Sequence, residues 1–233
     1  MRLLILILSA PFIALSRISE LWNICGIRAE ISRCLEVVDS SKEKVPFPFL
    51  ASLIAAEDHR GALHQGVDPV AMVRAVYVRI RYGKVQGAST VEQQFVRVVT
   101  GRYDRTLSRK AREQILAIAV SRHRSKLQIA SAYLSIAFYG SGCIGIKGLC
   151  SRCGNNLSCA DQNDIWEMIS RLKYPEPLQP STNWRMKLHR RIEYISCREA
   201  KSANKSIERD ARFAPAPHAG RWSRSILGGH VVE

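Results

Sequence analysis

Residues 56–68 read AEDHRGALHQGVD, and residues 86–97 read QGASTVEQQFVR. The first segment carries the carboxylate of Glu57, and Glu113 follows the second segment within RTLSRKAREQILA, residues 105–117. The segment between the two acids is polar and basic, where a buried core segment would be apolar. Two acids separated by a cluster of Ser, Thr, Gln and Arg indicate a site for acid–base chemistry on an anionic molecule.

Capping signals predict helices next to this stretch. Asp68 is typical of an N-cap and Pro69 of a first helical position, and Gly83 predicts the end of that helix. The residues from Ser89 to Glu92 fit a capping box ahead of a second helix. The polar cluster is therefore expected at helix termini.

The remaining pattern predicts a mainly α fold. Arg105, Arg109 and Glu113 are spaced four apart, so on a continuous helix they would line one face. Alternating strand patterns are scarce. Further helices are predicted over 126–138, 161–172 and 183–205.

The N-terminus carries an uncharged apolar run from Leu3 to Leu15. The run is shorter than the roughly 20 residues that span a bilayer, so it fits a signal-peptide core, an anchor extended toward Trp22, or a buried helix. We favour the anchor, because no polar residues mark one face. Two prolines at Pro46 and Pro48 predict an extended break before the main domain. The expected organisation is an anchor or signal-anchor over 1–22, a connector over 23–44, a main domain over 45–184, and a C-terminal helix with a flexible basic tail over 185–233.

Composition narrows the choice of partner. Lys and Arg outnumber Asp and Glu by 35 to 20, so an anionic partner is expected: nucleic acid, phospholipid or a phosphorylated substrate. A nucleic-acid recognition motif is lacking, which argues against the first of these. Among seven cysteines, the spacing of Cys143, Cys150, Cys153 and Cys159 could hold zinc, but disulfides or free thiols are favoured because no second CxxC or CxxH follows.

Five ordered motifs carry a family resemblance. They are E-D-x-x-x-x-x-H-x-G-x-D (57–68), R-A (74–75), Q-G-A-S-T-x-x-Q-Q (86–94), R-T-x-x-R-K-x-x-E (105–113) and S-K-x-x-I-x-x-x-Y-L (125–134). Together they resemble glycosyltransferase family 51, the peptidoglycan glycosyltransferases, in its monofunctional form, over about residues 45–182. The residues after Trp184 are too few for the transpeptidase domain of the bifunctional relatives.

The resemblance implies a mainly α, lysozyme-like domain with a small membrane-associated jaw lobe. It implies polymerisation of lipid II into β-1,4 glycan strands with inversion and release of undecaprenyl pyrophosphate. Glu57 would be the general base, and Glu113 a second acid that orients cations or helps to hold a divalent cation, Mg²⁺ or Mn²⁺. Substrate would contact Asp58, Arg74, Ser89, Gln93, Gln94, Arg97, Arg105, Arg109 and Lys110. The implied partners are lipid II, the growing glycan strand, the membrane and other wall-synthesis or division proteins, with no nucleic acid. The implied location is the extracytoplasmic side of the bacterial inner membrane, held by a single-pass anchor.

Several positions depart from the family pattern, and three of them bear on the site. Gly61 replaces an aromatic residue, Glu92 stands at the fourth place of S-T-I-T-Q-Q, and Val98 replaces an asparagine. These changes motivate an alternative function, a catalytically weak lipid II-binding or scaffold protein. Both principal acids are retained, so we expect activity.

Overall fold

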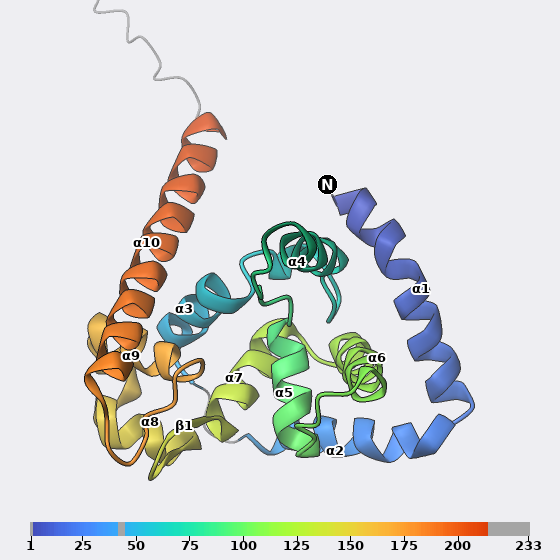
Figure 1. The fold of residues 1–233 in the computed structure, drawn as a ribbon, viewed down its shortest axis with the longest axis horizontal. Coiled ribbons are helices and arrows are strands. Elements are labelled where there is room, and N and C mark those ends of the chain that lie inside the picture. Colours follow the sequence, from blue (N-terminus) through green and yellow to red (C-terminus); the bar gives the residue numbers. More distant parts are fainter. Residues whose placement is uncertain (1, 42–44, 214–233) are drawn as a thin grey trace, which may run out of the picture.

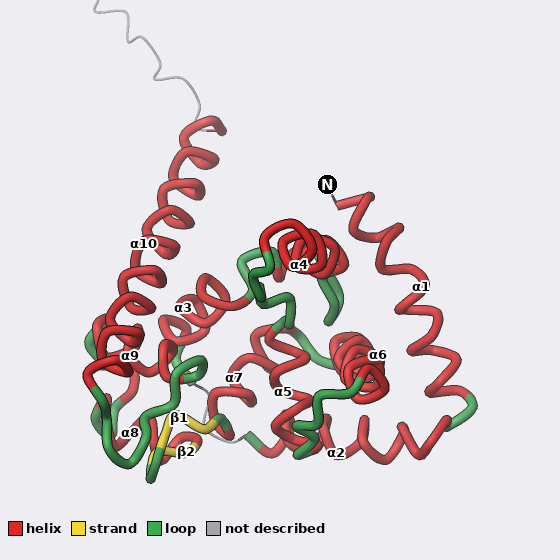
Figure 2. Tube along the Cα trace, viewed as in Figure 1, coloured by secondary structure: helices red, strands yellow, loops and turns green. Residues whose placement is uncertain are grey.

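The computed structural model describes residues 2–41 and 45–213, and this part of the chain is mainly helical, as predicted (Figures 1 and 2). The helices are α1 (Arg2–Leu21), α2 (Ile27–Ser40), α3 (Phe47–Glu57), α4 (Pro69–Tyr82), α5 (Val91–Thr100), α6 (Leu107–His123), α7 (Lys126–Ile136), α8 (Gly145–Cys153), α9 (Gln162–Arg171) and α10 (Thr182–Phe213). A small antiparallel hairpin pairs β1 (Phe138–Gly140) with β2 (Cys143–Ile144). Short 3-10 helices are η1 (Ile24–Gly26), η2 (Gly61–Leu63) and η3 (Leu157–Cys159).

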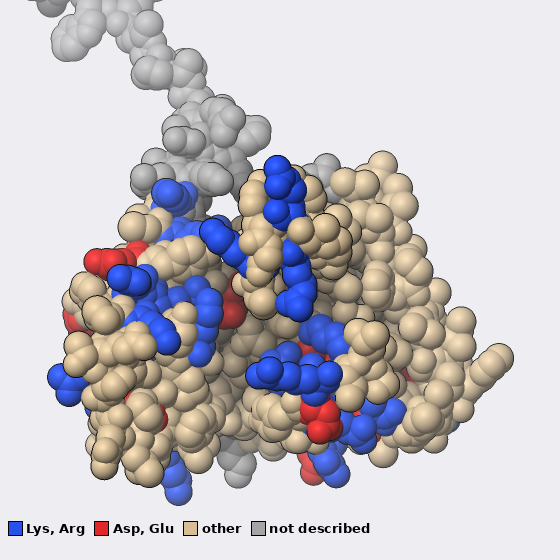
Figure 3. All heavy atoms as spheres, viewed as in Figure 1, with Lys and Arg blue, Asp and Glu red and all other residues tan. Residues whose placement is uncertain are grey.

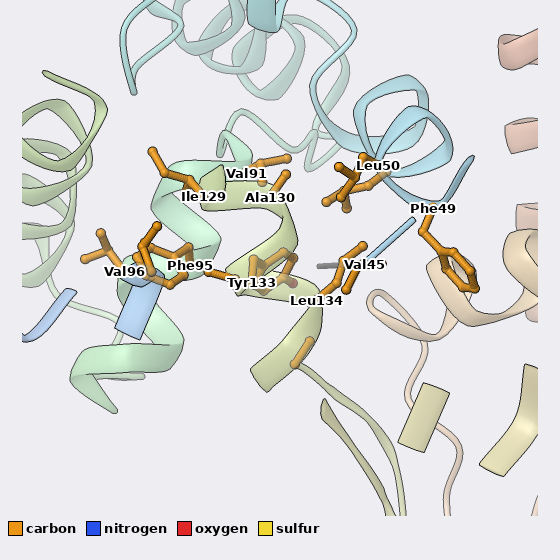
Figure 4. Close-up of a cluster of buried hydrophobic side chains, with 14 of the residues drawn as sticks. Val45, Phe49, Leu50, Val91, Phe95, Val96, Ile129, Ala130, Tyr133 and Leu134 are labelled. Carbon is orange, nitrogen blue, oxygen red and sulfur yellow. The ribbon is translucent and has the colours of Figure 1, made fainter. Parts of the chain in front are cut away.

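The core lies where α5 packs against α6 and α7, with α2 running along the base (Figure 1). Phe95 from α5, Leu116 from α6 and Leu134 from α7 are almost completely buried. Figure 4 shows Tyr133 in the same layer as Phe95 and Leu134. A buried aromatic of this size contributes roughly 2 to 3 kcal/mol through removal of apolar surface from water. This cluster holds α5 in place, and α5 carries the polar residues Gln93 and Gln94.

The caps of α4 agree with the prediction, whereas the cap of α5 differs. Asp68 accepts a hydrogen bond from the Ala71 amide at 2.9 Å, and Gly83 ends α4 with a φ of 63°. The predicted capping box is wrong, because Thr90, and not Ser89, is the N-cap of α5 and accepts from the Gln93 amide. The Glu92 side chain points into a buried ion pair instead.

Two further predictions need correction. Helix α6 begins at Leu107, with Thr106 capping the Arg109 amide, so Arg105 precedes the helix and does not share a helical face with Glu113. Pro48 lies in the first turn of α3, where its missing N–H costs nothing, so the extended break ends at Pro46.

Helix α1 is long and apolar enough to cross a membrane. The segment Leu3–Leu21 has a mean hydropathy of 1.7, and only 22% of it is buried. Figure 1 shows α1 rising along one side of the molecule to lie beside α4, and the Ser16 hydroxyl donates to the Ile115 carbonyl of α6 at 3.0 Å. Helix α4 exposes apolar side chains of its own, including Val73, Tyr77 and Ile80. Exposed apolar surface therefore gathers on two neighbouring helices, as expected for contact with lipid.

All seven cysteines are free thiols. Within residues 2–41 and 45–213, the cysteines do not converge into a group of three or more metal ligands. The zinc hypothesis therefore has no support in the described structure.

Candidate active site

Glu57 ends helix α3 and faces a cleft of about 540 Å³. Helix α10 forms one wall of the cleft, and the segment 86–90 forms part of another. In Figure 3, basic side chains gather on both sides of a hollow in which acidic atoms are visible. The basic residues that line the cleft are Arg60, Arg74, Lys173, Lys187, Arg190, Arg191 and Arg198. The cleft is suited to a large anionic molecule.

Each oxygen of the Glu57 carboxylate has a different partner. Oε1 accepts a hydrogen bond from Arg191 of α10, and Oε2 accepts from the Gln94 side-chain amide at 2.9 Å. The Tyr133 hydroxyl in turn donates to Gln94 Oε1 at 2.9 Å. The Glu57 side chain is 18% exposed, so it remains accessible from the cleft while both oxygens are held in place.

Arg191 is the main residue that the sequence reasoning missed. Its guanidinium also lies over the Tyr194 ring, 4.9 Å from the centroid. Helix α10 is fixed in turn by Glu199, which accepts hydrogen bonds from Ser52 of α3 and from Trp166 of α9. The sequence does carry a signal that Arg191 belongs to a functional surface, because the basic and aromatic residues of this helix recur at helical spacing. They are Lys187, Arg190, Arg191, Tyr194 and Arg198.

Glu113 lies at the centre of a second cationic group. Its buried carboxylate accepts from Arg97 Nε at 3.0 Å, from Lys110 Nζ at 2.7 Å, and from Arg109. Burial by itself would raise the pKa of Glu113, but hydrogen bonds from Arg97 and Lys110 outweigh it and hold the pKa below the usual glutamate value. Burial lowers the pKa of Lys110 against the opposing effect of Glu113. One carboxylate therefore holds three cations together and leaves an excess of positive charge for an anion.

The polar residues before and within α5 extend this group toward Glu57. Lys110 donates to Ser89 Oγ at 3.0 Å and to Gln93 Oε1 at 2.5 Å, and Gln94 of the same helix contacts Glu57. The structure thus connects the Glu113 group to the Glu57 carboxylate through α5. Among the predicted substrate residues, Asp58, Arg74, Ser89 and Gln94 line the cleft. The others are absent from its lining in the described part of the chain: Gln93, Arg97, Arg109, Lys110 and the exposed Arg105.

Asp58 belongs to a buried cluster behind Glu57. Its Oδ1 lies 2.8 Å from His64 Nε2, and Lys126 Nζ pairs with Glu92 and lies 3.9 Å from Asp58 Oδ2. Burial by itself would raise the pKa of Asp58, but the hydrogen bond with His64 and the positive charges of His64 and Lys126 hold it below the usual aspartate value. The Lys126 ammonium explains how a glutamate is tolerated at position 92, where its side chain is 2% exposed.

Neither acidic cluster fits a divalent cation. Both oxygens of Glu113 already accept hydrogen bonds from cationic side chains, so a metal ion there would meet three positive charges. Asp58, His64 and Glu92 could reach a common ion, but the Lys126 ammonium already pairs with Glu92 and lies 3.4 Å from His64 Nδ1. A metal ion at either place would have to displace a lysine or an arginine.

The departures at positions 61 and 98 fit the packing. A Cβ added at the buried Gly61 would lie 3.3 Å from the Asp58 carboxylate, so a larger side chain would require that carboxylate to shift. Val98 packs against the core, while Arg97 points to Glu113.

Replacing Lys126 by Met is expected to destabilise the fold. The change leaves the buried Glu92 carboxylate without its ion-pair partner, and it removes the positive charge near Asp58. Because Lys126 is 31% exposed, we expect a loss of about 2 to 3 kcal/mol in the free energy of unfolding, below that of a fully buried pair. Urea unfolding of the protein in detergent measures it.

Two further variants test the cause of that loss. Lys126→Met combined with Glu92→Thr should recover most of the stability, because the unpaired carboxylate is gone. Lys147→Met, at an exposed lysine, serves as the matched control and should change little. Equal stability of Lys126→Met and the parent would rule out the ion pair as the reason Glu92 is tolerated.

The comparisons with known proteins agree with this geometry. A family profile described as Transglycosylase matches residues 30–196. The chain is 40% identical over 108 residues to penicillin-binding protein 1A of Aquifex aeolicus (strain VF5). The aligned region covers 46% of the chain and 15% of that protein. The chain is 32% identical over 162 residues to penicillin-binding protein 1A of Rickettsia felis (strain ATCC VR-1525 / URRWXCal2), covering 66% and 20% respectively. It is 37% identical over 108 residues to penicillin-binding protein 1F of Bacillus subtilis (strain 168), covering 46% and 15%.

These relatives are much longer proteins, and the aligned region is a fifth or less of their length. The profile match begins within α2 and ends within α10, so it includes Glu57, Glu113 and Arg191. The chain belongs to the transglycosylase family, glycosyltransferase family 51.

Proposed function

We propose that this chain is a membrane-anchored peptidoglycan glycosyltransferase that polymerises lipid II into β-1,4 glycan strands and releases undecaprenyl pyrophosphate. The observation that carries the proposal is the Glu57 carboxylate in a cleft lined by basic side chains, with one oxygen held by Gln94 of α5 and the other by Arg191 of α10. Family membership supports the reaction class.

Glu57 is suited to be the general base of this reaction. The acceptor sugar's 4-hydroxyl gives its proton to the Glu57 carboxylate while its oxygen forms a bond to the anomeric carbon of the donor. The bond from that carbon to the pyrophosphate oxygen breaks in the same displacement, so the configuration inverts. Gln94 and Arg191 hold the carboxylate in one orientation, which spares the reaction the entropy cost of aligning it.

The two cationic groups give the reaction two places for anionic lipid carriers. We propose that Arg97, Arg109 and Lys110 stabilise the charge that develops on the leaving pyrophosphate. Helix α10 carries Arg190 and Arg198 into the cleft lining. These residues would hold the pyrophosphate of the acceptor molecule. Ser89, Gln93 and Gln94 lie beside these cations and are suited to bind sugar or phosphate oxygens.

Dependence on a divalent cation is common in this family. The carboxylates described above do not fit a protein-held metal ion, since basic side chains occupy their oxygens. We therefore propose that any Mg²⁺ or Mn²⁺ enters the cleft bound to the substrate pyrophosphate.

Membrane attachment fits the substrate, because lipid II is itself confined to a membrane. We propose that α1 anchors the chain in the bacterial inner membrane as a single pass, with the cleft on the extracytoplasmic side. The exposed apolar residues of α4 would rest at the same lipid surface and bring the cleft to the lipid carriers. Wall-synthesis or division proteins are proposed partners.

The test is incubation of the purified full chain with fluorescent lipid II and Mg²⁺ in detergent, with products resolved by size. Long products that lysozyme digests are the expected result. Binding of lipid II without chain formation would overturn the proposal in favour of a lipid II-binding scaffold.

The α10 cations give a separate prediction. Arg190→Gln combined with Arg198→Gln should lower kcat/KM for lipid II by roughly tenfold, because the cleft loses two charges that attract the anionic substrate. Arg185→Gln combined with Lys201→Gln also removes two positive charges from the same helix, but both residues lie outside the described cleft lining, so this variant should leave kcat/KM near the parent value. Equal losses in both variants would mean that only the overall charge of the protein matters. Initial rates of polymerisation at fixed ionic strength measure both.

A further inference from the structure

Gln94 connects a tyrosine in the core to the carboxylate in the cleft. Its amide nitrogen donates to Glu57 Oε2 and its amide oxygen accepts from the Tyr133 hydroxyl, each at 2.9 Å. Tyr133 is 5% exposed and lies in the packed layer with Phe95 and Leu134 (Figure 4). Packing of the ring therefore keeps the Tyr133 hydroxyl in one place. The Gln94 side chain has several rotatable bonds and is free to move unless a contact holds it.

The chemistry of the three groups permits one orientation of the amide. An ionised carboxylate only accepts hydrogen bonds, so the NH₂ of Gln94 must face Glu57. The amide oxygen is then left facing Tyr133, which must donate. Burial raises the pKa of Tyr133, and the nearby Glu57 charge raises it further, so the phenol keeps the proton that it donates. Without the hydroxyl, the amide oxygen would lose its donor, and the Gln94 side chain could rotate away from the carboxylate.

We propose that Tyr133 is a positioning residue for Glu57 and acts through the amide of Gln94. The inference rests on the proposed function, because it assigns Tyr133 a part in holding the general base. The Tyr133 hydroxyl fixes the side-chain amide of Gln94, and this amide fixes Oε2 of Glu57. Arg191 of α10 fixes Oε1 of the same carboxylate. The carboxylate is held from both sides, by one contact anchored in the core and one on α10.

The chain offers a matched control in Tyr139. This tyrosine is also buried, and its hydroxyl donates to the Leu134 carbonyl at 2.7 Å. Tyr139→Phe removes a buried hydroxyl of the same kind with no hydrogen bond to Gln94 or Glu57 in the described structure. Any effect that is special to Tyr133→Phe therefore reports on the connection to Glu57.

The kinetic test compares Tyr133→Phe, Tyr139→Phe and the parent with lipid II. We expect Tyr133→Phe to lower kcat by about 10- to 100-fold while KM stays within about twofold, because substrate contacts remain and only the base is misaligned. Tyr139→Phe should keep the parent kcat. An unchanged kcat in Tyr133→Phe would overturn the proposal.

A double-mutant cycle tests whether Tyr133 acts through Gln94. In a Gln94→Met background, Tyr133→Phe should have no further effect on kcat, since the connecting amide is already absent. Additive losses would show that Tyr133 acts by another route and would overturn the inference.

A measurement without substrate separates this proposal from the proposed function. The side-chain NH₂ of Gln94, assigned by its loss in Gln94→Met, should exchange slowly with water in ¹⁵N-labelled parent protein. In Tyr133→Phe it should exchange as fast as an exposed glutamine, and in Tyr139→Phe it should stay protected. Fast exchange in the parent would overturn the positioning role even if the protein polymerises lipid II. Protection in an inactive parent would support the contact and contradict the function alone.

Discussion

Replacing Glu57 by Gln should abolish polymerisation, lowering kcat by about 1000-fold or more, while lipid II binding stays within about twofold. The amide has the size of the carboxylate but cannot take the proton from the acceptor hydroxyl. The cations that line the cleft remain, so the anionic substrate is still held. Size-resolved products from fluorescent lipid II measure turnover, and fluorescence anisotropy measures binding.

A matched control distinguishes loss of the base from loss of charge. Glu193→Gln makes the same chemical change on an exposed surface of α10 and should polymerise like the parent. Chains of normal length from Glu57→Gln would refute Glu57 as the base. Loss of both binding and turnover would instead point to a role for the carboxylate in holding Arg191 and the cleft wall.

Replacing Glu113 by Gln should lower kcat by about 100-fold, because the group that organises the leaving-group cations is neutralised. Arg97, Arg109 and Lys110 then repel one another without the central negative charge and shift from their places. Polymerisation rates measure this loss, and saturation with lipid II separates kcat from KM. A kcat equal to that of the parent would mean that the cations keep their positions without Glu113.

The same variant should change how stability depends on pH. Because the pKa of Glu113 is lower in the folded protein than its ordinary value of about 4.3, its contribution to stability is fully present above that value. The contribution disappears as the pH falls through the folded pKa. Urea unfolding between pH 7 and pH 3.5 should therefore show a shallower loss of stability in Glu113→Gln than in the parent. Identical pH dependence would mean that Glu113 is not stabilised by its neighbours.

The sequence by itself determined the local features. The Asp68 and Gly83 signals act within one turn of the chain, and the structure has both where they were predicted. The mainly α class followed from patterns of the same short range, and the ordered motifs led to the family. Short-range signals also misled at Ser89, because two adjacent hydroxyl residues can each cap a helix and only packing selects Thr90.

Only the tertiary structure decided the partners of the acids. Arg191 contacts Glu57 across a separation of 134 residues, Lys126 pairs with Glu92 across 34, and Gln94 reaches Glu57 across 37. These contacts depend on how α10, α7 and α5 pack against α3 and against one another, and that packing is set by buried apolar faces rather than by the polar residues themselves. Spacing along a helix predicts which residues share a face. Which face meets which carboxylate is settled only when the helices are packed together.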